Sequence, residues 1–205
     1  ASLREALVER AAKVAPLTGA ASRRVLEQRL AETFFRSREE GSSIAVVICD
    51  LDHFKRINDT YGHPTGDLAL KAVAQLLLAP ARGDDLCARF GGEEFVLLFE
   101  ETTGETALEI AERLRKRVEA LVLKAPSGEP IALTMSVGIA AAPELAVKSA
   151  DDLLHLADQA LYTAKHLGRN LCLLDTGQGR LRTAAGDVVE LAESPAVPDA
   201  PVFFA

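Results

Sequence analysis

The sequence is poor in the residues that cross-link small extracellular proteins or anchor chains in membranes. Its 205 residues include no tryptophan, one methionine and three cysteines. Cys49, Cys87 and Cys172 are odd in number and form no CxxC pair. This excludes a disulfide framework and a CxxC zinc site, and it indicates reduced thiols in the cytoplasm. No apolar run reaches the roughly 18 residues of a membrane span. We therefore expect a cytoplasmic fragment without membrane contact, which leaves open an anchor in upstream segments of a longer protein.

Positive charge is also scarce, since the formal net charge is −7 at pH 7. Surfaces that coat nucleic acid are normally basic, so we expect no nucleic-acid partner. The negative charge does not exclude nucleotides as ligands, because a metal and a few local cations can neutralise their phosphates. By contrast, 48% of the residues are hydrophobic and 26% are charged. This balance is typical of a chain that buries a core, and the length suits one domain with extensions.

The chain divides into three parts. Residues 1–14 carry apolar side chains at helical spacing and lack an initiator methionine. We interpret them as the end of a signalling helix that arrives from an upstream domain of a longer protein. Residues 15–175 form the patterned domain. Residues 176–205 are rich in glycine, alanine and proline. We expect this extension to dock on the domain and to form a small hairpin within 180–191.

Apolar periodicity in the domain predicts alternating helices and strands. Ser22 is placed to cap a helix that runs to about Arg38, and the continuous apolar run 44–49 is typical of a central strand. The other expected elements are a helix at 68–78, a hairpin at Gly91-Gly92, a helix at 105–122, a strand at 131–139, a helix at 150–166 and a strand at 171–174. This order predicts an α/β fold in which a mixed central sheet is flanked by helices.

Acidic residues stand at the ends of two predicted strands. Asp50 follows the apolar run, and Glu93 and Glu94 follow the glycine pair of RFGGEEF. Glycine reaches the positive φ of a tight turn without strain. Should the hairpin pair with the central strand, these carboxylates meet, and oxygen ligands from a strand end and a turn suit Mg²⁺. Two such ions support nucleotidyl transfer. The spacing alone leaves open that Asp50 caps a turn and that the glutamates are solvated.

Two further pairs allow more than one interpretation. Asn58 and Asp67 can read guanine, because an aspartate accepts from guanine N1–H and N2–H together and rejects adenine. Alternatively, Asn58 forms a turn and Asp67 caps the helix 68–78. Lys165 and Arg169 can clamp a phosphate, or they are cations that favour the dipole at a helix end.

Five motifs occur together in one order across residues 15–175. They are PLTG with Arg23-Arg24, DLDHFKRINDTYGHPTGD at 50–67, RFGGEEF at 89–95, SVGIA at 136–140 and ADQALYTAKHLGRN at 157–170. Through them the chain resembles a GGDEF domain of the diguanylate cyclase family. The resemblance implies a fold related to adenylyl cyclase and polymerase palm domains. It also implies that two GTP molecules become cyclic di-(3′,5′)-guanylate and two pyrophosphates, with one GTP bound by each protomer of a homodimer.

The resemblance also implies roles for individual residues. Asp50, Glu93 and the Leu51 carbonyl would hold two Mg²⁺ or Mn²⁺ ions per half-site, and Glu94 would assist deprotonation of the 3′-hydroxyl. The implied substrate contacts are Phe54 and Lys55 at the β- and γ-phosphates, Asn58 and Asp67 at guanine, Gly91 and Gly92 along the nucleotide, and Lys165 and Arg169 at the γ-phosphate. Asp52 matches the motif, and we expect a structural role for it. The third position of the GGEEF stretch keeps a carboxylate.

A second implied site precedes the hairpin. Arg82 and Asp85 match the RxxD pattern of a product-binding inhibitory site, in which cyclic di-guanylate is held through phosphate and guanine contacts. A solvated loop is the alternative for so short a motif. The sequence departs from the family at Ala15, Ala20 and Ser22 around the LTG turn. These departures affect the junction with the upstream sensor domain more than the chemistry.

Three functions follow from these patterns. The leading hypothesis is an active, GTP-specific diguanylate cyclase, a nucleotidyltransferase regulated by dimerisation and by product inhibition. The alternative is a catalytically silent module that binds GTP or cyclic di-guanylate and signals by interaction. A cyclase with relaxed purine choice is disfavoured by Asp67.

Overall fold

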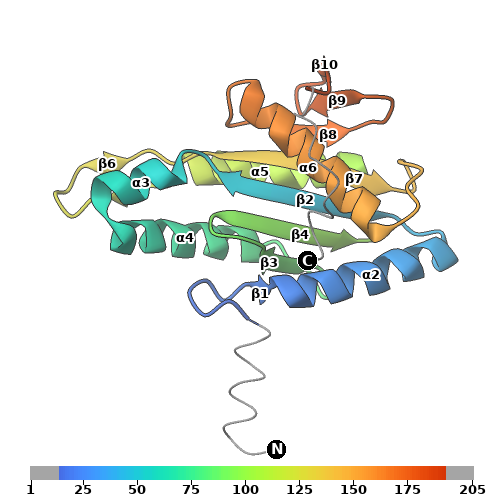
Figure 1. The fold of residues 1–205 in the computed structure, drawn as a ribbon, viewed down its shortest axis with the longest axis horizontal. Coiled ribbons are helices and arrows are strands. Elements are labelled where there is room, and N and C mark those ends of the chain that lie inside the picture. The colour runs from blue at the N-terminus through green and yellow to red at the C-terminus, as the bar shows by residue number, and fades with distance from the viewer. Residues whose placement is uncertain (1–13, 193–205) are drawn as a thin grey trace, which may run out of the picture.

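A computed structural model describes residues 14–192 of the chain (Figure 1). The helix expected before residue 14 and the end of the expected extension, 193–205, lie outside the described residues. Val14, the last residue of the part interpreted as the upstream helix, instead forms a β-bridge with Ala21. The bridge closes a short loop that contains the PLTG turn.

One mixed sheet organises the domain, as the sequence predicted. Its strands are ordered β1-β3-β4-β2-β7-β8-β9-β10, and β5 and β6 form a separate two-stranded sheet. The strands are β1 (Ala21–Ser22), β2 (Ile44–Leu51), β3 (Leu86–Arg89), β4 (Glu94–Glu100), β5 (Leu123–Lys124), β6 (Pro130–Ile131), β7 (Met135–Ala142), β8 (Cys172–Asp175), β9 (Arg180–Thr183) and β10 (Val188–Glu190). The helices are α2 (Arg23–Glu40), α3 (Phe54–Tyr61), α4 (His63–Leu78), α5 (Gly104–Glu119) and α6 (Ala150–His166).

Helices cover both faces of the sheet (Figure 1). On one face, α4 and α5 pack over Val47 and Cys49 of β2; on the other, α2 and α6 pack over Val46 and Ile48. Side chains alternate between the two faces of a strand, so a central strand between two helical layers must be apolar at every position. The uninterrupted apolar run of β2 is therefore a consequence of its place in the middle of the sheet.

Helix boundaries follow local signals in most places. Ser22 caps α2 by accepting a hydrogen bond from the backbone N–H of Val25, as predicted. Ser149 and Asp152 form a reciprocal capping box at the start of α6, which spans the predicted residues. The expected helix 105–122 is shifted and shorter: Thr103 caps it so that it begins one residue earlier, at Gly104, and it ends three residues earlier, at Glu119.

Two expected elements differ from the structure. The expected helix 68–78 begins earlier, at His63, and a separate helix, α3, precedes it. Pro64 lies in the first turn of α4, where its missing N–H costs nothing. The expected strand 131–139 is divided, since β6 pairs with β5 outside the main sheet and β7 runs on to Ala142.

The C-terminal segment extends the sheet. The hairpin expected within 180–191 is present: β9 and β10 are antiparallel, and β9 pairs with β8. Arg182 of β9 forms an ion pair with Glu105 of α5, and the backbone N–H of Ala192 donates to Thr163 Oγ1 over 3.1 Å. The described part of the extension is thus attached to the domain. Within residues 14–192, no helix is long and apolar enough to cross a membrane.

Candidate active site

The acidic residues meet at the end of β2. β4 pairs antiparallel with β2, and this register sets Asp50 opposite Glu94. The Leu51 N–H donates to the Glu93 carbonyl over 3.4 Å, so the hairpin follows β2 past its last paired residue. Asp50 is only 9% exposed. The hairpin does pair with the central strand, which was the condition for these carboxylates to meet, so Asp50 of β2, Glu94 of β4 and Glu93 of the turn lie together.

At the glycine pair, Gly91 makes room for a neighbouring side chain, and neither glycine has a special backbone angle. The sequence suggested positive φ at this turn, but neither Gly91 nor Gly92 is among the positive-φ residues of the described chain, so that expectation is wrong. A Cβ atom on Gly91 would lie 2.7 Å from Oε2 of Glu94. Arg89 instead holds the turn, donating from Nε and Nη2 to the Gly92 carbonyl at 3.1 and 2.7 Å. A side chain on Gly91 would therefore displace the Glu94 carboxylate.

A lysine from α6 neutralises this cluster in part. The Nζ atom of Lys165 lies 3.0 Å from Oδ2 of Asp50. Burial raises the pKa of Asp50, and the charges of Glu93 and Asp52 raise it further, while Lys165 opposes the shift. Burial likewise raises the pKa of Glu94, with Asp50 as the next contributor. The site therefore carries more negative charge than one lysine relieves.

This charge balance and the type of ligand fit a divalent cation. Lys165 Nζ already places a positive charge against Asp50. Among the described residues, no three His, Cys, Asp or Glu side chains are grouped tightly enough to hold a metal by themselves. Mg²⁺ commonly takes only one or two carboxylates and completes its shell with water and substrate phosphates. Asp50, Glu93 and the Leu51 carbonyl are donors of that kind.

A cavity of about 510 Å³ opens beside the glycine turn. It contains six of the predicted site residues: Phe54, Lys55, Asn58, Asp67, Gly92 and Glu93. The predicted residues Asp50, Leu51, Glu94, Gly91, Lys165 and Arg169 do not line it. Of these, Asp50 lies opposite Glu94 of the hairpin, and Lys165 forms an ion pair with Asp50. Helices α3 and α4 thus supply one wall of the cavity, and the hairpin supplies another.

The predicted guanine-reading pair lies on two packed helices. Asn58 is within α3 and Asp67 is within α4, so Asp67 is not the N-cap and Asn58 is not part of a turn. Both of these alternatives are wrong. Gly66 permits the contact between the helices, since a Cβ atom there would lie 1.9 Å from Asn58 Oδ1. The absent side chain lets Asn58 lie directly against α4, next to Asp67.

The lining includes residues that sequence reasoning missed: Asp59, His63, Leu70 and Arg89. The signal for Leu70 was its position three residues after Asp67, which sets both on one face of a helix. Arg89 directly precedes Phe90 in the quoted hairpin motif, and its role as a brace for Gly92 depends on the folded turn. Asp59 and His63 became visible only once α3 and the early start of α4 were known.

Asp52 has the structural role expected for it. Its carboxylate accepts hydrogen bonds from Thr134 Oγ1 and Ser136 Oγ, each at 2.7 Å, and from the backbone N–H of Asn170 at 3.0 Å. Its own N–H donates to the Thr134 carbonyl over 2.9 Å. These bonds fasten the segment after β2 to β7 and to the loop after α6. Arg169 is exposed in that loop.

The predicted inhibitory pair lies at the opposite end of the hairpin from the acids. Arg82 and Asp85 belong to the loop between α4 and β3. The Asp85 carboxylate accepts hydrogen bonds from the backbone N–H groups of Arg82 and Glu100, at 2.9 and 3.2 Å. Arg29 of α2 donates to the Asp84 carbonyl over 3.0 Å. The loop is therefore ordered by its own aspartate, while Arg82 is exposed.

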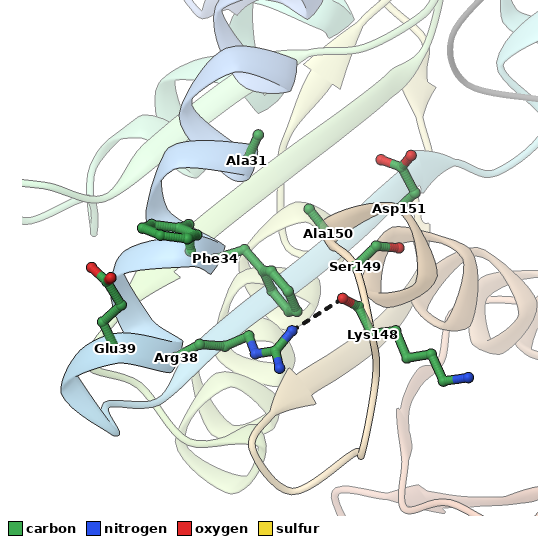
Figure 2. A pocket seen from close by; sticks show the side chains of 9 residues that line it. Ala31, Phe34, Arg38, Glu39, Lys148, Ser149, Ala150 and Asp151 are labelled. Atoms are coloured by element: carbon green, nitrogen blue, oxygen red, sulfur yellow. Dashed lines mark hydrogen bonds between the residues drawn. The ribbon is translucent and has the colours of Figure 1, made fainter.

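A larger hollow, of about 700 Å³, lies between α2 and the start of α6. Figure 2 shows Phe34 and Arg38 of α2 facing Lys148 and Ser149 across it, with Arg38 Nη1 donating to the Lys148 carbonyl over 3.2 Å. None of the predicted site residues lines this hollow. The smaller cavity beside the hairpin is the candidate active site because Glu93 of the acidic turn and the predicted guanine contacts Asn58 and Asp67 line it.

The comparisons with known proteins agree with this geometry. The family model described as "Diguanylate cyclase, GGDEF domain" matches residues 12–171. Diguanylate cyclase DgcP of Pseudomonas aeruginosa is 41% identical over 155 residues, which are 76% of this chain but only 23% of DgcP. The chain thus spans less than a quarter of that curated relative.

Solved structures show the same fold. The coiled coil and GGDEF domain of DgcB from Caulobacter crescentus, in complex with c-di-GMP, has a TM-score of 0.78 at 34% identity, covering 84% of this chain and 92% of that one. The active GGEEF domain of a diguanylate cyclase from Vibrio cholerae has a TM-score of 0.69 at 32% identity, covering 75% and 96%. By its sequence, its fold and the position of its acidic hairpin, the chain belongs to the GGDEF domain family of diguanylate cyclases.

Proposed function

We propose that this domain joins two GTP molecules into cyclic di-(3′,5′)-guanylate and releases two pyrophosphates. The observation that carries the proposal is the single cavity that contains Asn58, Asp67 and Glu93. It combines a carboxylate and a carboxamide suited to guanine with an acid of the hairpin. Guanine presents N1–H and N2–H to Asp67, whereas adenine leaves that carboxylate unpaired, so GTP is preferred.

Two protomers are required for this reaction. Each described chain offers one such cavity, and the 3′-hydroxyl of each GTP must attack the α-phosphate of the other. A homodimer that sets the two cavities face to face holds the nucleotides in reactive orientation, which is a contribution of proximity. An upstream sensor domain in the longer protein would control this pairing.

The hairpin and the end of β2 would hold two Mg²⁺ or Mn²⁺ ions per half-site through Asp50, Glu93 and the Leu51 carbonyl. Such ions, when bound, neutralise charge at the reacting phosphate and favour the alkoxide form of the attacking hydroxyl. Phe54 and Lys55 contact the β- and γ-phosphates, and Lys165 and Arg169 hold the γ-phosphate. Gly91 and Gly92 bring the hairpin backbone close to the nucleotide.

Glu94 is suited to take up the proton of the 3′-hydroxyl. Burial and the neighbouring carboxylates raise its pKa above the ordinary value for a glutamate. A general base works best when its pKa approaches the operating pH, so this shift strengthens Glu94 as a proton acceptor. Its position opposite Asp50 keeps it beside the proposed metal ligands.

The product would inhibit the enzyme at a second site. Arg82 is exposed and offers a guanidinium for a phosphate or a guanine edge of cyclic di-guanylate, and Asp85 offers a carboxylate for a guanine edge. The β3–β4 hairpin joins this loop to the acidic turn. Binding at one end of the hairpin can therefore restrain the other.

The test is product formation by the purified protein with Mg²⁺ and GTP, with ATP in parallel. We expect cyclic di-guanylate and pyrophosphate in a one-to-two ratio from GTP alone, with a rate that declines as product accumulates. The same assay is repeated with a dimeric coiled coil fused before residue 1. If the fused protein also forms no product but binds GTP or cyclic di-guanylate, the cyclase proposal is wrong and the domain is a binding module.

A further inference from the structure

Arg169 and Asn170 adopt an unusual backbone conformation. Both are left-handed, with φ of 68° and 48°, and they directly follow Gly168 at 114°. Residues other than glycine rarely take this conformation, because Cβ crowds the following carbonyl. Two such residues in succession persist only where the surrounding structure fixes them. The loop after α6 is therefore held in place by specific contacts.

The contacts that hold the loop converge on Asn170. Its side-chain oxygen accepts a hydrogen bond from Arg115 Nη1 at 2.6 Å, and its Nδ2 donates to Glu119 Oε1 at 2.9 Å. Its backbone N–H donates to Asp52 Oδ2 at 3.0 Å. Asn170 is thus fastened on one side to α5 and on the other to the segment that follows β2.

Arg115 is built into α5 rather than extended into solvent. The residue is 9% exposed, and it binds both oxygens of Glu112, from Nε at 2.8 Å and from Nη2 at 2.7 Å. Its Nη1 also donates to Glu119 over 3.0 Å. Planar guanidinium groups fixed by two-pronged contacts of this kind hold one orientation. Arg115 therefore offers Asn170 a rigid donor.

This network borders the proposed active site without entering it. Arg115 does not line the cavity beside the hairpin. Its partner Asn170 is the neighbour of Arg169, and Asp52 is the neighbour of Leu51. The chain of bonds from Arg115 through Asn170 to Asp52 therefore links the position of the phosphate-binding loop to the end of β2.

We propose that Arg115 is a positioning residue that fixes Arg169 at the γ-phosphate by holding Asn170. The inference rests on the proposed function, in which Arg169 contacts the γ-phosphate of GTP. Arg115 acts only through the loop, so it affects the part of the affinity that the terminal phosphate supplies. Recognition of guanine by Asn58 and Asp67, on α3 and α4, does not depend on it.

The experiment compares the affinities of α,β-methylene-GTP, GDP and GMP in Mg²⁺ by calorimetry. The methylene analogue keeps the γ-phosphate and cannot release pyrophosphate. The variants are Arg115→Met and Asn170→Gly, with Arg113→Met, at an exposed arginine of the same helix, as the control. Asn170→Gly keeps the N–H bonded to Asp52 and tolerates positive φ, so it tests the loop even where loss of Arg115 impairs folding.

In both variants we expect the preference for the triphosphate analogue over GDP to fall about tenfold, the scale of one charge-assisted hydrogen bond. The affinity for GMP should stay within about twofold of wild type, as expected for an undisturbed guanine pocket. Arg113→Met should leave all three affinities unchanged. A preference that persists in folded Arg115→Met and in Asn170→Gly overturns the inference alone. If the wild-type protein binds no guanine nucleotide, both the inference and the proposed function are wrong.

Discussion

Lys165 Nζ lies 3.0 Å from Asp50 Oδ2, which joins the last turn of α6 to the end of β2. If Asp50 binds a divalent cation as proposed, the Lys165 ammonium group competes with that cation for the same carboxylate. Replacing Lys165 with methionine should therefore strengthen binding of Mn²⁺ alone by about fivefold, the size of a modest ion pair. The same change should weaken binding of GTP. Calorimetry with Mn²⁺ checks this, and Lys124→Met is the control. Unchanged or weaker Mn²⁺ binding would contradict the assignment of Asp50 as a metal ligand.

Glu93→Ala should abolish turnover and leave the fold intact. Glu93 is partly exposed at the turn, where it lines the cavity and lies outside the buried core. We expect the rate of cyclic di-guanylate formation to fall by about 10³-fold or more, as for loss of a central electrostatic group. Glu109→Ala, at an exposed glutamate of α5, is the matched control. Activity that survives in Glu93→Ala, with an unchanged circular dichroism spectrum, would refute the role given to Glu93.

Asp67→Asn should remove the preference for GTP over ATP. The asparagine offers one acceptor oxygen and an NH₂ group in place of two acceptors, so it cannot receive both guanine N–H groups. Affinity for GTP should fall by about 100-fold, while affinity for ATP changes little. The measurement is a pair of binding titrations, with Glu40→Gln as the control. Retained discrimination would assign the choice of base to other residues of the cavity.

Arg82→Ala should relieve inhibition by the product. The exposed side chain can be removed without disturbing the loop, because the bond from the Arg82 N–H to Asp85 is made by the backbone. The concentration of cyclic di-guanylate needed for half-inhibition should rise about tenfold. Lys71→Ala is the control on the neighbouring helix α4. Asp85 is a poorer target, since its carboxylate also orders the loop. Unchanged inhibition in Arg82→Ala would remove the RxxD assignment.

Glu94→Gln should stabilise the protein without Mg²⁺ or nucleotide. Burial and the charge of Asp50 raise the pKa of Glu94 in the folded state. The native protein then holds this proton more tightly than the unfolded chain, and the charged form costs stability at higher pH. The variant should therefore melt about 1–3 °C higher at pH 8, a value discounted for partial exposure. The gain should vanish as pH falls through the raised pKa. A gain that grows towards low pH would contradict the sign.

Much of this site could be predicted because its signals are local. Asp50 directly follows the apolar run that forms β2. The glycine pair stands between two strand-like runs, and ordinary hairpin rules predict that these two runs pair. Ser22 marked a helix start in the same way. The alternation of helices with strands predicted a mixed sheet between helical layers, and the structure and the similar solved domains confirm it.

The remaining features depend on contacts between distant residues. The segment before Leu68 was not predicted to be helical, yet α3 ends and α4 begins around Gly62, and these two helices form the wall that carries Asp59 and His63. The Lys165–Asp50 pair and the bond from Arg115 to Asn170 join residues far apart in the sequence. No periodicity predicts such pairs, because packing of the helices on the sheet decides them. At the Gly91-Gly92 turn, positive φ was expected, but the absent side chain of Gly91 instead makes room for Glu94.

The contact between α3 and α4 restricts how the choice of base can evolve. Asn58 lies so close to Gly66 that even a methyl group at position 66 would overlap its amide oxygen. A side chain at position 66 would therefore displace Asn58 from its place in the cavity lining. Under the proposed function, a change in the choice of base at this wall would come more directly from Asp67, which lines the same cavity.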